Sequence, residues 1–138
     1  MTPPPWPGRR RVGALLASLF LAAAFQPGPA LAKDHVLLLL VSNYQHVSPL
    51  PGVRHDRKNA LELAQLLGYD TRQAQVLADA QLAGDGIQRA VRTLAASVQN
   101  GDRLFFYYSG HGTSFPADGG CAEALVPQDA KGDVKGLV

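Results

Sequence analysis

The most constraining feature of the sequence is an apolar run at residues 35–41, which reads His-Val-Leu-Leu-Leu-Leu-Val. A strand with one face in water alternates apolar and polar side chains, and this run does not alternate. It is typical of a central strand in a parallel sheet, where both faces are covered. The run therefore predicts an α/β fold with helices packed on both sides of a sheet.

Two later segments carry apolar residues at helical spacing and predict the covering helices. The first spans residues 54–67 and meets a stop signal at Gly68. The second spans residues 87–98, with Asp85 as a candidate N-cap. The two apolar stripes contain Ala60, Leu63, Ala64 and Leu67, and then Ile87, Ala90, Val91, Leu94, Ala95 and Val98.

Two further strands complete a β-α-β-α-β order. A short strand is expected within residues 71–77, and the aromatic run at residues 103–109 indicates a buried strand. Residues 79–86 and 113–120 are polar and predict loops. This order implies a parallel sheet with right-handed crossovers, whose last strand is left as an exposed edge.

The aromatic run stops abruptly on Ser109-Gly110-His111-Gly112. The carboxyl ends of strands are where open α/β sheets bind ligands. Glycine lets a backbone approach a substrate closely, and histidine titrates near neutral pH. The motif therefore predicts general acid–base chemistry at His111, and the simpler alternative is a surface turn that happens to contain a histidine.

Residues 1–32 have the pattern of a secretory signal peptide. Three arginines at residues 9–11 precede an apolar run at residues 12–25, and Ala30-Leu31-Ala32 forms a small-x-small cleavage site. The alternative is a membrane anchor, although the run is shorter than the roughly 20 residues of a spanning helix. We therefore expect a leader at residues 1–32, a domain at 33–138 without a stable membrane span, and export to the periplasm or the medium.

Charge and cysteine content narrow the partners. The leader holds three of the 13 Lys and Arg residues and none of the 11 Asp and Glu residues, so the remainder is slightly acidic. No basic stripe suggests nucleic-acid binding. Cys121 is the only cysteine, so no internal disulfide can form, and its thiol is either buried or reactive.

Several short motifs together carry a family resemblance. In order they are Asn43-Tyr44, Leu50-Pro51-Gly52 before Asp56, Leu67-Gly68-Tyr69, the aromatic strand with Ser109-Gly110-His111-Gly112, and Glu123-Ala124-Leu125-Val126-Pro127-Gln128-Asp129. The chain resembles the caspase-like cysteine peptidases, nearest the bacterial metacaspase-like branch, over residues 34–129. The resemblance implies a three-layer α/β/α caspase-like fold with a mostly parallel sheet, here only as its first β-α-β-α-β part.

The resemblance also implies roles for individual residues. His111 matches the histidine of a Cys–His dyad, and Gly112 matches the glycine whose N–H helps to form the oxyanion hole. Asp56 matches an acidic residue that lines the pocket for a basic side chain, and Ser109 is assigned to substrate binding with it. The alternative for Asp56 is a charge favoured at a helix N-terminus. The implied substrate is a polypeptide with Arg or Lys before the scissile bond.

Two departures from the family pattern limit these assignments. The family nucleophile sits in an Asp-x-Cys-His-type turn on the next strand, and no such motif exists here. Cys121 is too close to His111 for the crossover of about a dozen residues that a parallel neighbour requires. The loop after His111 has Asp118 as its lone carboxylate, with Glu123 just beyond, whereas calcium takes about six to eight oxygen ligands. We therefore expect no cofactor, including calcium.

Three functional interpretations remain. The first is an incomplete cysteine endopeptidase, which lacks the nucleophile and is inactive alone. The second is a non-catalytic caspase-like module for binding or regulation. The third is a doubly wound ligand-binding domain, which requires a glycine-rich turn after the first strand that Ser42-Asn43-Tyr44-Gln45 does not supply.

Overall fold

A computed structural model describes residues 1–2, 32–117 and 119–131. The chain divides into two units, Met1–Ala30 and Leu31–Val138, and every helix and strand described belongs to the second. The leader expected at residues 1–32 lies almost entirely outside the described residues, so export and the anchor alternative stay predictions. Within the described part, no helix is both long and apolar enough to cross a bilayer.

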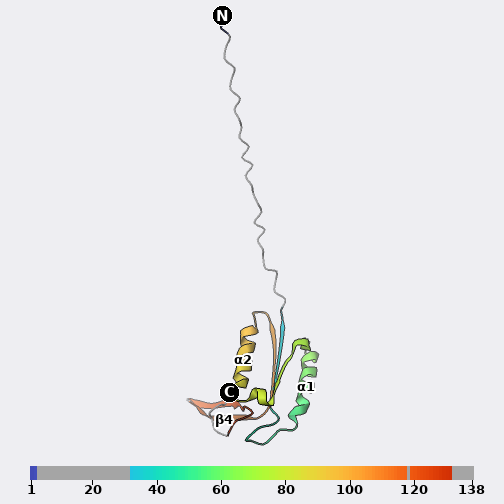
Figure 1. The fold of residues 1–138 in the computed structure, drawn as a ribbon, viewed down its shortest axis with the longest axis vertical. Coiled ribbons are helices and arrows are strands. Elements are labelled where there is room, and N and C mark those ends of the chain that lie inside the picture. The colour runs from blue at the N-terminus through green and yellow to red at the C-terminus, as the bar shows by residue number, and fades with distance from the viewer. Residues whose placement is uncertain (3–31, 118, 132–138) are drawn as a thin grey trace. The chain divides into compact units, whose positions relative to one another are not determined.

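The centre of the domain is a three-stranded parallel sheet with the order β2-β1-β3 (Figure 1). Strand β1 (Asp34–Leu40) is the apolar run, and its residues from Val36 onward are buried. Strands β2 (Gln75–Ala78) and β3 (Arg103–Ser109) pair with its two edges. One helix lies between β1 and β2 in the chain and another between β2 and β3, so the expected β-α-β-α-β order is confirmed.

Helices α1 (Val53–Leu66) and α2 (Gly86–Ser97) cover opposite faces of the sheet (Figure 1). Successive strand side chains point to opposite faces, so β1 serves both layers. Val36, Leu38 and Leu40 pack with α1, whereas Leu37 and Leu39 pack with α2. The continuous apolar run thus belongs to two separate cores, which is why it does not alternate.

The apolar stripe predicted for the first helix was only partly buried as expected. In α1 the buried residues are Val53, Ala60 and Ala64, and Leu63 and Leu67 are exposed. The buried stripe is therefore narrower than the apolar spacing suggested, because small alanines let the helix lie close to β1. The helix ends as expected, with Gly68 at a φ of 79°.

The N-terminus of α2 also differs in detail from the prediction. Asp85 occupies the N-cap position, but its side chain makes no capping hydrogen bond. Its carboxylate pairs instead with the guanidinium of Arg89, one turn along the helix. The charge therefore interacts with a side chain rather than with the free N–H groups of the first turn.

The segments around β2 were only partly predicted. The short strand expected within residues 71–77 is confirmed as β2, but it is preceded by a 3-10 helix, η1 (Thr71–Gln73), that was not expected. The expected loop at residues 79–86 starts with another 3-10 helix, η2 (Asp79–Leu82). Leu82 is fully buried in the α2-side core, which anchors η2 there.

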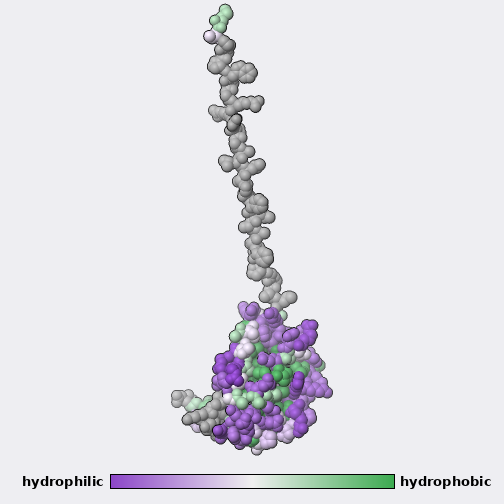
Figure 2. All heavy atoms as spheres, viewed as in Figure 1, coloured by the Kyte–Doolittle hydropathy of each residue, from purple (hydrophilic) through white to green (hydrophobic). Residues whose placement is uncertain are grey.

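The prediction that residues 103–109 are buried was wrong. In the described part β3 pairs only with β1, so one edge is open, and Leu104 and Phe106 are 44% and 42% exposed. Figure 2 shows hydrophobic side chains gathered on the viewed face of the domain, bordered by hydrophilic ones. The exposed last strand expected from the sequence is therefore observed.

The polar loop predicted at residues 113–120 is instead a hairpin. Strand β4 (Gly112–Ala117) pairs antiparallel with β5 (Gly120–Leu125). Gly119 in the turn has a φ of 86°, which suits a residue without a Cβ. Asp118, the carboxylate considered for calcium, lies outside the described residues.

Candidate active site

His111 lies between the end of β3 and the start of β4, at the carboxyl edge of the parallel sheet. Its Nε2 is 2.8 Å from the carbonyl oxygen of Ser48, in the loop that follows β1. A carbonyl oxygen only accepts hydrogen bonds, so Nε2 carries the proton. Proton transfer by this histidine would therefore take place at the other ring nitrogen, Nδ1.

The backbone of His111 is held from both sides. Its N–H donates to the Tyr44 hydroxyl at 2.7 Å. Its carbonyl accepts from the Tyr108 hydroxyl at 2.8 Å and from the Val126 N–H at 3.0 Å. In the sequence Tyr44 stands out only as part of the Asn43-Tyr44 motif, since a contact across 67 residues leaves no local pattern.

Gly112 directs its N–H away from β5. Residues opposite each other in an antiparallel pair alternate between hydrogen-bonded and non-hydrogen-bonded. Because the His111 carbonyl accepts from Val126, the next pair, Gly112 with Leu125, is of the second kind. The Gly112 N–H is thus directed to the side of β4 opposite β5 and takes no part in the hairpin ladder.

Asp56 and Ser109, both predicted to bind substrate, lie in direct contact. Asp56 lies in the first turn of α1, and Ser109 ends β3 on the face that α1 covers. The Ser109 hydroxyl donates to Asp56 Oδ2 at 2.5 Å. Burial and the Asp56 charge together raise the pKa of Tyr107, two residues before Ser109.

The environment of Asp56 suits the recognition of a cation. No Lys or Arg side chain among residues 32–117 and 119–131 forms an ion pair with it. Its place in the first helical turn also satisfies the alternative, a charge that complements the helix dipole. Both interpretations are compatible, because a dipole can hold a carboxylate that also binds a ligand.

Cys121 is not beside His111. It lies on β5 opposite Pro116, with an exposed side chain, and not in the loop expected from the sequence. Pro116 is five residues along the strand from His111, which corresponds to roughly 17 Å at the rise of an extended chain. The chain's only thiol is therefore far beyond hydrogen-bond reach of the imidazole.

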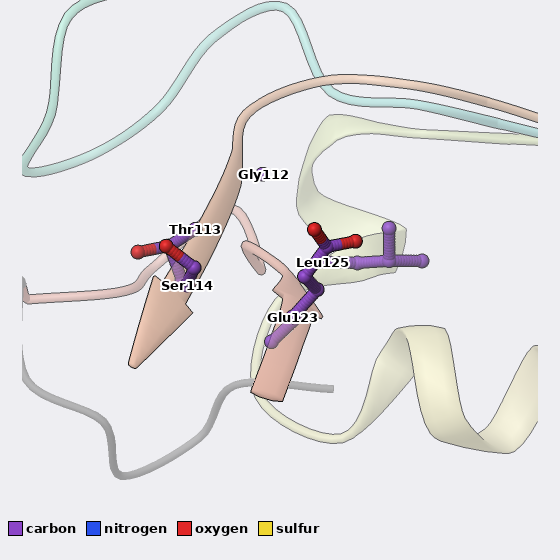
Figure 3. A pocket seen from close by; sticks show the side chains of 6 residues that line it. Gly112, Thr113, Ser114, Glu123 and Leu125 are labelled. Atoms are coloured by element: carbon purple, nitrogen blue, oxygen red, sulfur yellow. The ribbon is translucent and has the colours of Figure 1, made fainter. Parts of the chain in front are cut away.

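A hollow of about 480 Å³ lies on the hairpin next to Gly112 (Figure 3). Its lining consists of Gly112, Thr113, Ser114, Glu123, Ala124 and Leu125. Glu123 is the only charged residue in that lining. Among residues 32–117 and 119–131, no three His, Cys, Asp or Glu side chains are grouped closely enough to hold a metal ion.

Comparison with known proteins agrees with this geometry. The family model described as "Caspase domain" matches residues 33–137. Metacaspase-1A of Aspergillus niger is 32% identical over 117 residues, which cover 76% of this chain and 29% of that protein. Metacaspase-6 of Arabidopsis thaliana is 32% identical over 105 residues, 67% of this chain and 28% of its own length.

The chain thus spans less than a third of the length of these relatives. The matched region nevertheless contains the parallel sheet, both covering helices and the segment that carries His111. From the family match and the observed fold together, the chain belongs to the caspase-domain family.

Proposed function

We propose that this chain supplies the histidine half of a cysteine endopeptidase centre that cleaves polypeptides after Arg or Lys. The proposal rests on the hydrogen bonding of His111. Its Nε2–H donates to the Ser48 carbonyl, which leaves Nδ1 for proton transfer. The neighbouring Gly112 N–H is turned out of the hairpin ladder, as a donor to a developing oxyanion must be.

The reaction would follow the course of acyl transfer to a thiol. His111 Nδ1 takes the proton from a cysteine thiol, and the thiolate attacks the scissile carbonyl carbon. The Gly112 N–H stabilises the resulting oxyanion, and the imidazolium returns its proton to the leaving amine. Water then hydrolyses the thioester. Cys121 is too distant for this role, so the proposal places the thiol on a segment outside these 138 residues.

Substrate preference in this proposal depends on Asp56. A carboxylate without a cationic partner can pair with the guanidinium or ammonium group of a substrate. The Ser109 hydroxyl, 2.5 Å from Oδ2, orients the carboxylate and leaves its other oxygen for the ligand. Asp56→Asn should remove the charge while retaining the size, and so lower cleavage after Arg by about tenfold or more.

A second candidate is a non-catalytic caspase-like module that binds or regulates another protein. The separation of Cys121 from His111 favours it, because a Cys–His mechanism needs its partners within hydrogen-bond distance. The coding DNA beyond Val138 discriminates between the two. A downstream Asp-x-Cys-His turn in any frame supports the peptidase, and its absence supports the binding module.

The experiment begins with residues 33–138 and a fluorogenic peptide ending in Arg. We expect no turnover, because the acyl-enzyme cannot form without a nearby thiol. Turnover abolished by both Cys121→Ala and His111→Ala would instead identify Cys121 as a relocated nucleophile. A longer product that contains the Asp-x-Cys-His turn should cleave Arg-ending peptides and spare Asp-ending ones. Equal cleavage of both peptides would refute the proposed role of Asp56.

A further inference from the structure

Two tyrosine hydroxyls bond the two peptide groups that flank the Cα of His111. Tyr44 comes from the loop after β1, and Tyr108 comes from β3 on the face toward α2. Tyr44 accepts the His111 N–H at 2.7 Å, and Tyr108 donates to the His111 carbonyl at 2.8 Å. Both hydrogen bonds are directional, so together they orient the peptide planes before and after His111, from whose Cα the imidazole projects.

The two hydroxyls also lie close to each other and to the Val126 carbonyl. Tyr44 and Tyr108 oxygens are 3.4 Å apart, and they lie 3.4 Å and 3.2 Å from the Val126 oxygen. Tyr44 already accepts from His111, so its own proton is directed toward Val126 or Tyr108. Burial raises the pKa of Tyr108, which therefore remains a neutral donor at physiological pH.

Gly110 shows how tightly this arrangement is packed. A Cβ on Gly110 would stand 2.4 Å from the Tyr108 hydroxyl and 2.7 Å from the Tyr44 hydroxyl. Real Cβ atoms do not approach other atoms this closely, so the hydroxyl pair requires glycine immediately before His111. The chain turns from β3 into β4 directly around the two tyrosines.

The Tyr44 ring also contacts the imidazole itself. The ring centroids of Tyr44 and His111 are 4.8 Å apart, with the planes tilted by 50°. Ser48, whose carbonyl fixes the imidazole tautomer, belongs to the same loop. This loop is closed by Ser42 and Leu50, which exchange a backbone and a side-chain hydrogen bond. One loop thus supplies both the aromatic ring that packs on the imidazole and the carbonyl that accepts its Nε2 proton.

The loop is held firmly on each side of Tyr44. Before it, the Asp79 carboxylate accepts from the backbone N–H groups of Ser42 and Asn43, both at 2.8 Å. After it, Gln45 donates to the side chain of Gln128 at 2.9 Å. Gln128 is only 8% exposed, and its amide donates to the Asn43 carbonyl at 2.7 Å.

We infer that Tyr44 is a positioning residue for His111: its hydroxyl holds the His111 backbone and its ring holds the imidazole against the Ser48 carbonyl, which selects the tautomer. The inference rests on the proposed function only in that positioning His111 would serve catalysis. The contacts themselves do not depend on whether a cysteine thiol lies near His111. Loss of either contact should free the imidazole to rotate away from Ser48 and to exchange its two tautomers.

The test is nitrogen-detected NMR of the histidine rings in the full 138-residue chain. Tyr44→Phe removes the hydroxyl and keeps the ring, whereas Tyr44→Leu removes both. In the parent chain we expect a single His111 tautomer protonated at Nε2. In Tyr44→Phe the exchange of the Nε2 proton with water should rise roughly fivefold to tenfold, as for the loss of one hydrogen bond. Tyr44→Leu should in addition show averaged tautomers.

Tyr69→Phe is the matched control. The Tyr69 hydroxyl also donates to a backbone carbonyl, that of Leu104 at 3.1 Å, and its ring also packs against an aromatic ring, Phe105. It belongs to the α1-side core and makes no contact with His111. A purely structural role for Tyr44 would make both Tyr→Phe variants alike in their His111 signals.

Unchanged tautomer and exchange of His111 in Tyr44→Phe, at a melting temperature similar to that of Tyr69→Phe, would overturn the inference. If Tyr44→Leu does not fold, the Phe variant still decides. Peptidase activity plays no part in this readout, so failure of the proposed function and failure of the positioning role are separate results.

Discussion

Replacement of Gly110 by alanine should destabilise the domain, because there is no room for a methyl group beside the two tyrosine hydroxyls. The added Cβ would lie 2.4 Å from the Tyr108 hydroxyl and 2.7 Å from the ring carbon that bears it. Both rings are partly buried against the α2-side core, and both hydroxyls are hydrogen-bonded, so neither is the free end of a flexible side chain. Relief of the contact requires a movement of the backbone or of Tyr108.

The change in the free energy of unfolding caused by Gly110→Ala is the difference between a steric cost and an entropic gain. Overpacking of a filled site costs about 1–3 kcal/mol. Alanine also lowers the conformational entropy of the unfolded chain, which stabilises the folded state by roughly 0.4–1 kcal/mol where the backbone conformation suits alanine. Gly110 is not at a positive φ, so both contributions apply. A net loss of about 1–2 kcal/mol lowers the melting temperature of a domain this size by roughly 4–16 °C.

Gly112→Ala is the control for this prediction. A Cβ on Gly112 would meet only the Ala124 carbonyl, at an ordinary distance of 3.8 Å, and Gly112 is not at a positive φ either. We expect it to leave the melting temperature unchanged or to raise it slightly. Thermal unfolding of residues 33–138, followed by circular dichroism, measures both variants. Equal melting temperatures for Gly110→Ala and Gly112→Ala would refute the steric argument.

Three further predictions address stability, export and cofactors. N–H groups of Lys33 and Gln99, with the His35 ring, lower the pKa of the Asp102 carboxyl to about 2. The folded pKa lies below the unfolded one, so this stabilisation is present above about pH 4 and lost as the pH falls toward 2. Asp102→Asn should therefore lower the melting temperature at pH 7 and have much less effect near pH 2. Mass spectrometry of the protein from its native host should show an amino terminus at or near Lys33, and a soluble cytoplasmic protein that begins at Met1 would contradict export. Calcium chelation should leave peptide cleavage by a longer, thiol-bearing product unchanged, whereas activity restored only by calcium would contradict the expectation of no cofactor.

Local patterns predicted the parts of the fold that depend on burial and periodicity. The unbroken apolar run at residues 35–41 predicted a strand buried on both faces, since its short length suits a strand and it has no polar face to present to water. The two helices followed from their spacing, and Gly68 marked the end of the first. His111 could be placed at the carboxyl edge because the aromatic strand stops there. The motif that pairs Asp56 with Ser109 came from the family resemblance rather than from spacing.

The hairpin of β4 and β5 could not be predicted in the same way. Its two strands contain glycine, proline and small polar residues, which are typical of loops. Leu125 packs against the α2-side core, and the His111 carbonyl bonds to the Val126 N–H. These tertiary contacts at the base of the hairpin hold residues of low strand propensity in an extended ladder.

Apolar spacing did not determine burial in the helices and β3, where Leu63, Leu67 and Phe106 are exposed. The sequence by itself did determine that β1 enters the core and that His111 follows the end of β3, because continuous apolarity and an abrupt strand end are properties of short segments. Only the tertiary structure decided how that residue is held. Tyr44 and Ser48 approach His111 from the loop after β1, and Tyr108 approaches it from β3. No local pattern records which hydroxyl will meet its backbone or which carbonyl will meet its imidazole. The same reason separates Cys121 from His111: ten residues along the chain become two ends of an extended hairpin once the strands have paired.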